Sequence, residues 1–149
     1  MPQSFAALYF HFVFSTKDRA PMIAPEIQPR LYEYIGGLCR KRECTLLAAG
    51  GMPDHVHLLV SMARDITASA FMRETKAVSS KWLHETGGMK HFLWQQGYGV
   101  FSVSVSQLEV VTQYIQNQAL HHAKKSFQDE FIELLQRHNI PYDPKTIWL

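Results

Sequence analysis

The sequence predicts an α+β fold in which one antiparallel sheet packs against helices. Short alternating runs, rich in aromatic and β-branched residues, are interleaved with stretches of helical period. Two successive strand-like runs are also separated by a short segment of glycine and proline, which is typical of a hairpin. The chain has 149 residues, 46% of them hydrophobic, so we expect residues 1–149 to form one domain around one core.

The first half of the chain contains three predicted strands and one helix. Residues 8–14 alternate as a buried strand does, and a helical period begins at residue 25. Its apolar stripe consists of Ile27, Leu31, Ile35 and Leu38. Residues 45–49 and 55–62 are the second and third strands, and the tight connection between them predicts an antiparallel hairpin.

The next stretch completes the order of elements. Thr67 is placed to cap a second helix that runs to about Glu85, where two glycines stop it. Residues 92–94 and 100–105 have the pattern of a strand, a loop and a strand. The order strand, helix, two strands, helix, strand predicts a ferredoxin-like (RRM-like) sandwich with helices on one face of its sheet. Many unrelated functions share that topology, so it does not decide the chemistry.

Two more helices are predicted towards the C-terminus. Residues 106–109 (Ser-Gln-Leu-Glu) have the pattern of a capping box, with Val105 and Val110 as a hydrophobic staple. That pattern predicts a helix from there to about Lys125. Residues 127–137 form a final helix, and the tail after it needs a docking surface on this molecule or a neighbour.

Composition and charge exclude several classes of protein. No apolar run approaches the roughly 18 residues that span a bilayer, and no secretion signal is present, so we expect a cytoplasmic protein without a membrane partner. Two cysteines give no disulfide framework. The net charge of +2 is modest, but local clusters of cations are either solvated surface or a track for phosphates. The candidate DNA contacts are Lys17, Arg19, Arg73, Lys76 and Lys81.

A His-x-His pair heads the third strand. Residues two apart in a strand project to the same face, so His55 and His57 stand side by side while Val56 and Leu58 point into a core. Neutral imidazoles are common ligands of divalent metals. The pair by itself also fits two histidines on a solvent-facing strand, and zinc proteins and nucleotide hydrolases use the same pattern.

Tyr114 and Gln118 lie four residues apart on a predicted helix and therefore share one face. If that helix packs over the sheet, His55, His57 and the amide oxygen of Gln118 could hold a divalent cation, with open positions for phosphate oxygens. A phenol, with a pKa of about 10, needs a metal or a base to act as a nucleophile. The alternative is a half-buried structural tyrosine beside a surface amide.

Four motifs in order give a specific resemblance. They are residues 11–19 (HFVFSTKDR), 52–60 (MPDHVHLLV), 94–104 (WQQGYGVFSVS) and 114–118 (YIQNQ), the last followed by a His-His pair at 121–122. Their combination resembles the single-tyrosine HUH transposases of the insertion-sequence 200 and 605 type, including relatives associated with repetitive extragenic palindromes. The likeness covers nearly the whole chain.

The resemblance implies a DNA transposase that acts on single strands. It assigns Tyr114 as the nucleophile that forms a 5′-phosphotyrosine link, and His55, His57 and Gln118 as ligands of Mg²⁺ or Mn²⁺. It also implies DNA partners with hairpin-marked ends, and a homodimer in which the tyrosine helix of one subunit serves the histidines of the other. Ligand type alone does not select magnesium, because imidazoles suit zinc or manganese at least as well.

Three other functions stay open at this point. One is a domesticated relative that cuts or binds palindromic repeats without moving an element. Another is a non-catalytic DNA-binding repressor, for which Tyr114 would be dispensable. The third is a phosphohydrolase of small nucleotides that uses His55 or His57 directly, and it leaves residues 94–122 without a purpose.

Overall fold

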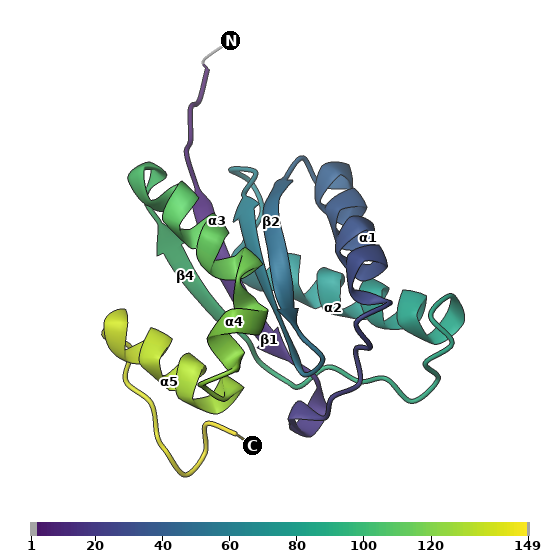
Figure 1. Ribbon diagram of the computed structural model, residues 1–149. Helices are drawn as coiled ribbons and strands as arrows, with labels where there is room; N and C mark the ends of the chain where they lie inside the picture. Colours follow the sequence, from purple (N-terminus) through teal and green to yellow (C-terminus); the bar gives the residue numbers. More distant parts are fainter. Residues whose placement is uncertain (1–2, 149) are drawn as a thin grey trace.

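A computed structural model describes residues 3–148 of the chain and contains one four-stranded antiparallel sheet (Figure 1). The strand order is β2-β3-β1-β4, so the His-x-His strand lies in the interior of the sheet. The strands are β1 (Tyr9–Ser15), β2 (Thr45–Met52), β3 (His55–Ser61) and β4 (Gly99–Val103). This order and the intervening helices confirm the predicted ferredoxin-like α+β fold.

Helices cover both faces of the sheet. Helix α1 (Gln28–Lys41) and helix α2 (Ala68–Glu85) share the main hydrophobic core with one face. On the other face lie α3 (Leu108–Gln116), α4 (Gln118–His122) and α5 (Phe127–Arg137) (Figure 1). Two short 3-10 turns, η1 (Lys17–Arg19) and η2 (Val105–Gln107), follow β1 and β4. The predicted C-terminal helices are therefore a separate layer over the sheet.

The period-two pattern of β3 decides which of its side chains meet which layer. Val56, Leu58 and Val60 are fully buried in the core beneath α1 and α2. The residues between them face the other way, so His55 and His57 point towards the C-terminal helices. This alternation is the one that the sequence predicts.

A glycine of β2 allows α3 to approach the sheet closely. A Cβ atom at Gly50 would lie 2.2 Å from the carbonyl oxygen of Ile115, which is backbone and cannot move aside easily. Gly50 pairs with His57 across the β2–β3 hairpin, and Ile115 is next to Tyr114 in α3. The absence of a side chain here brings the tyrosine helix down onto the strand that carries the histidines.

The prediction of one continuous helix from residue 106 to 125 is wrong. Helix α3 starts at Leu108 and ends at Gln116, and Asn117 (φ −99°, ψ 26°) separates it from α4. The capping box does not form, because the 3-10 turn η2 takes up its first two residues and no side chain caps the start of α3. The hydrophobic staple is also absent, since Val105 and Val110 are 69% and 60% exposed.

Residues 92–94 form a loop rather than the predicted strand. Their apolar character has another cause, which is packing into the main core: Phe92 is buried and Trp94 packs edge-on against Phe14. The Trp94 indole also donates a hydrogen bond to Ser79 of α2. A single bridge between Thr16 and Trp94 is the β-pairing that this segment makes among the described residues.

The C-terminal tail docks on the molecule itself. The Trp148 ring lies 6.3 Å from that of Phe127 and 6.0 Å from that of Phe131, both on α5. Cys39 and Cys44 are buried and free, as a chain without a disulfide framework requires. None of the helices in residues 3–148 is both long and apolar enough to cross a membrane.

Candidate metal and nucleophile site

The two histidines of β3 are completely buried, with 0% exposure each. Their Nδ1 atoms are held from outside: the His55 Nδ1–H donates to Asp54 Oδ1 at 2.7 Å, and His57 Nδ1 lies 2.8 Å from His11 Nε2. Outer partners of this kind fix the orientation of a metal-binding imidazole and leave Nε2 for the metal. Both Nε2 atoms point into the space beneath the C-terminal helices.

A buried carboxylate from α5 occupies that space. Glu130 is 1% exposed, and its Oε1 lies 2.9 Å from His57 Nε2 and 3.5 Å from His55 Nε2. Burial opposes ionisation, but contacts with His122 and His57 outweigh it and hold the pKa of Glu130 well below its usual range. The carboxylate is therefore a buried anion ringed by imidazoles.

Tyr114 and Gln118 reach the same place in spite of the break between α3 and α4. The Tyr114 hydroxyl donates a hydrogen bond to Glu130 Oε2, and Gln118 Oε1 lies 3.1 Å from His55 Nε2. The Gln118 side-chain amide also donates to the Tyr114 carbonyl at 3.3 Å. Burial, followed by the hydrogen bond to Glu130, raises the pKa of the Tyr114 hydroxyl, which therefore keeps its proton at neutral pH.

A third imidazole comes from the end of α4. The His122 Nδ1–H donates to the Lys125 carbonyl at 2.6 Å, and its Nε2 lies 3.1 Å from Glu130 Oε1. One ligand atom from each of four residues lies within 4.8 Å of the other three: His55, His57, His122 and Glu130. Burial lowers the pKa of His57 to about 4, so this ring is neutral at pH 7, as a metal ligand must be. These residues therefore fit a divalent metal.

The sequence predicts the residues at the centre of this site but not several of the others. His55, His57, Tyr114 and Gln118 do come together. Glu130 was missed because a helix acid is usually exposed, and Asp54 and His11 were not singled out as partners of the pair. One signal was available: Glu130 lies three residues after Phe127 and four before Leu134, on the buried stripe of its helix.

The five candidate DNA contacts do not form one cluster. Arg73 and Lys81 are exposed on α2, on the opposite side of the sheet from the histidines, and Lys17 is exposed after β1. The Arg19 guanidinium lies 5.1 Å from the centre of the Trp148 ring.

Lys76 donates to the carbonyls of Gln95 and Gly97, and burial lowers its pKa to about 8. The Lys76 ammonium group therefore already has two hydrogen-bond acceptors within the molecule.

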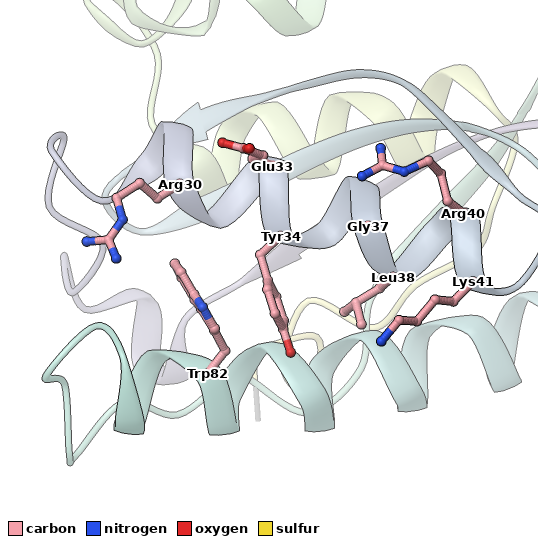
Figure 2. Close-up of a pocket in the computed structure, with 8 residues that line it drawn as sticks. All are labelled: Arg30, Glu33, Tyr34, Gly37, Leu38, Arg40, Lys41 and Trp82. Atoms are coloured by element: carbon pink, nitrogen blue, oxygen red, sulfur yellow. The ribbon is translucent and has the colours of Figure 1, made fainter.

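A groove of about 430 Å³ lies between α1 and α2 on that same side (Figure 2). The rings of Tyr34 and Trp82 stack inside it with their centres 5.0 Å apart, and the Arg30 guanidinium lies 5.7 Å from the centre of the Trp82 ring. Figure 2 shows Arg40 and Lys41 towards the other end of the groove. Aromatic faces flanked by cations are typical of surfaces that bind nucleic acid.

This fold and site define a class of protein. An antiparallel sheet presents a buried His-x-His pair, and a following helix brings a tyrosine hydroxyl to it, which is the arrangement of the single-tyrosine HUH proteins. The chain belongs to the IS200-like transposase family, because the model of that family, described as "Transposase IS200 like", matches residues 4–118.

Curated relatives agree with this assignment. The chain is 28% identical over 115 residues to the transposase for insertion sequence element IS200 of Salmonella typhimurium LT2, a match that covers 73% of this chain and 75% of the relative. It is 23% identical over 120 residues to the ISDra2 transposase TnpA of Deinococcus radiodurans, with 74% and 84% covered.

Two solved structures share the fold. A transposase candidate from Deinococcus radiodurans R1 superposes with a TM-score of 0.60 at 24% identity, over 79% of this chain and 98% of the other. A REP-associated tyrosine transposase bound to a REP hairpin also gives a TM-score of 0.60, at 18% identity, over 82% of this chain and 73% of the other. At these identities the likeness concerns the fold.

Proposed function

We propose that this transposase cleaves and rejoins single-stranded DNA at hairpin-marked ends through a 5′-phosphotyrosine intermediate on Tyr114. One observation carries the proposal: the Tyr114 hydroxyl and the Nε2 atoms of His55 and His57 converge on one buried point in a member of a transposase family. A nucleophile beside a set of metal ligands is what phosphoryl transfer to a side chain requires.

The proposed metal ligands include His55, His57 and the amide oxygen of Gln118, and the metal is Mg²⁺ or Mn²⁺. When bound, a divalent cation supplies positive charge that polarises the phosphoryl group. The distance of 3.1 Å between Gln118 Oε1 and His55 Nε2 supports this role for Gln118. The hydrogen bond between Asp54 and His55 keeps that ring in the tautomer whose Nε2 carries no hydrogen and can bind a metal.

The bond changes in the proposed reaction balance without a further reactant. The Tyr114 oxygen forms a bond to phosphorus, the bond from phosphorus to the 3′ oxygen breaks, and that oxygen leaves as a hydroxyl. The proton lost by the phenol equals the proton gained by the leaving group. Attack of a 3′-hydroxyl on the phosphotyrosine reverses these steps and rejoins DNA, so no ATP is consumed.

Residues 1–149 act as one domain in this proposal, because α5 supplies Glu130 to a site on the sheet. The DNA partner is proposed from the family and from the related REP-associated transposase, which is bound to a hairpin. A homodimer is proposed from the family resemblance. The proposed phosphate contacts are Lys17, Arg19, Arg73 and Lys81, together with the cations of the α1–α2 groove; Lys76 is the weakest of the original five, since it binds two carbonyls.

The groove gives a test of the DNA surface. We expect the double variant Arg40→Gln/Lys41→Gln to reduce the magnitude of the slope of log K against log salt concentration by about 1.5. Each phosphate contact contributes roughly 0.7 to 0.9 to that slope. Fluorescence anisotropy of a labelled hairpin oligonucleotide at several salt concentrations measures this slope. Lys145→Gln removes an exposed cation in the C-terminal tail and is the matched control. An unchanged slope in the double variant would remove the groove from the DNA surface.

The function itself is tested with single-stranded hairpins that are labelled at the 3′ end, the part of the strand that stays on the protein, and that are taken from the DNA that flanks the gene. We expect incubation with protein and Mn²⁺ or Mg²⁺ to give a labelled protein band on a denaturing gel, and EDTA to abolish it. Tight hairpin binding without this adduct would favour the repressor. Turnover of free nucleotides without it would favour the phosphohydrolase. An adduct on dispersed palindromes, but not on element ends, would indicate the domesticated relative.

A further inference from the structure

We propose that Glu130 and His122 complete the metal site within a single chain, and that Glu130 also positions the Tyr114 hydroxyl. This inference rests on the proposed function and extends its ligand set to two residues to which the family resemblance assigns no role. The partner on the outer side of each imidazole ring decides whether each of its nitrogens donates or accepts a hydrogen bond.

Because of these outer partners, the Nε2 lone pairs of His55 and His122 face the lone pairs of oxygen atoms. Asp54 and the Lys125 carbonyl can only accept, so the Nδ1 atoms of His55 and His122 are donors. In a neutral ring, Nε2 then carries a lone pair. Both lone pairs point at oxygen acceptors, because His55 Nε2 is 3.1 Å from Gln118 Oε1 and His122 Nε2 is 3.1 Å from Glu130 Oε1. His122 Nε2 is buried and has no hydrogen-bond partner within residues 3–148.

Such an arrangement is stabilised by one cation shared between the rings. The rings are close enough to share it, since the His55 ring lies 4.5 Å from that of His122 and 5.1 Å from that of His57. A single divalent cation satisfies all the lone pairs together and also neutralises the buried Glu130 carboxylate.

The distances fit a shared ion. Two ligand atoms bound to one ion with bonds of about 2.1 Å lie about 3.0 to 3.4 Å from each other. Glu130 Oε1 lies 2.9, 3.1 and 3.5 Å from the Nε2 atoms of His57, His122 and His55. Small movements of the side chains would open the centre of this cluster to a metal, with Oε1 as one of its ligands.

The donor set predicts which metal is preferred. Mg²⁺ favours oxygen ligands and octahedral geometry, whereas imidazole nitrogens suit transition metals. With three imidazoles and one carboxylate, the site should bind Mn²⁺ more tightly than Mg²⁺. Two imidazoles alone leave this choice open, but a third imidazole from His122 decides it for this chain.

The second carboxylate oxygen links the metal site to the nucleophile. Glu130 Oε2 accepts the hydrogen bond of the Tyr114 hydroxyl and lies 3.2 Å from His121 Nε2, while Oε1 faces the other imidazoles. A carboxylate that bridges in this way fixes the distance from the hydroxyl to the ligand cluster. Glu130 is therefore a positioning residue for Tyr114 as well as a ligand.

Mn²⁺ binding in the absence of DNA tests the ligand set. We expect Glu130→Gln and His122→Gln each to weaken Mn²⁺ binding at least about 10-fold by calorimetry and to change the Mn²⁺ EPR spectrum. Glu133→Gln is the matched control, because Glu133 lies one turn further along α5 and pairs with Lys125 and Arg137 at the surface. Circular dichroism shows whether each variant is folded. Mn²⁺ binding as in the wild type, or tighter binding by Glu130→Gln, would overturn the inference.

A second measurement tests the positioning role. In Glu130→Gln, saturated with Mn²⁺, we expect the single-turnover rate of adduct formation to fall while hairpin affinity is unchanged. An unchanged rate would show that Glu130 does not position Tyr114. Failure of these tests is distinguishable from failure of the proposed function, since the wild-type protein would still form the adduct in the first case and would not form it in the second.

Discussion

Tyr114→Phe is expected to abolish the covalent protein–DNA adduct and to leave hairpin binding unchanged. The substitution removes one oxygen, the atom that we propose as the nucleophile, and keeps the ring that packs against Ala48, Leu59 and Ile115. Loss of a covalent nucleophile lowers turnover by roughly 10⁴-fold or more. The variant should fold normally, although it leaves Glu130 with one hydrogen bond fewer.

The adduct assay with labelled hairpins measures this effect, and anisotropy measures binding in parallel. Tyr142→Phe is the control, because Tyr142 lies in the C-terminal tail and its hydroxyl contacts Gln136 rather than the site. We also expect Tyr114→Phe to bind Mn²⁺ like the wild type, since the hydroxyl is not among the proposed ligands. An adduct that persists in Tyr114→Phe would mean that another side chain attacks the phosphate.

The parts of the fold that follow from local patterns were predictable. The alternation of β3 separates a buried aliphatic face from the face of His55 and His57, and the sequence alone contains that period. The stripe of α1 and the Thr67 cap of α2 are equally local, and the Thr67 hydroxyl does accept from the Ala70 amide. Spacing also predicted that Tyr114 and Gln118 would act on the same side of their segment.

The features that the sequence patterns did not predict depend on docking between elements that lie far apart in the sequence. Glu130 enters the site because α5 packs on Val13 and Phe101 of the sheet, and no local pattern states where α5 will lie. Lys76 looked like a free cation, but the loop after α2 folds back and places two carbonyls on it. The capping box failed for a similar reason, since the chain leaves β4 through a 3-10 turn before α3 begins.

The same long-range packing brings the tyrosine and the histidines of one chain together. Within one chain, Gln118 contacts His55, and Tyr114 shares the Glu130 carboxylate with His57. Helix α3 is held on the sheet by the close approach of Ile115 to Gly50, and α5 by its own apolar cluster. We therefore expect the site to be assembled in one subunit, even if the protein is a dimer, in contrast to the exchange that the family resemblance implies.

Mixing two inactive variants distinguishes these arrangements. We expect an equimolar mixture of His57→Asn and Tyr114→Phe, co-refolded so that subunits redistribute, to form no more adduct than either variant alone. If helices were exchanged between subunits, half of the randomly formed dimers would be mixed and each would contain one intact composite site, which restores about a quarter of the wild-type sites. A co-refolded mixture of wild type with Tyr114→Phe controls for recovery and should keep about half of the adduct. Recovery towards a quarter in the mixture of the two variants would show that Tyr114 acts on the histidines of the other subunit. In the dimer, contacts between subunits would then replace the contacts within one chain.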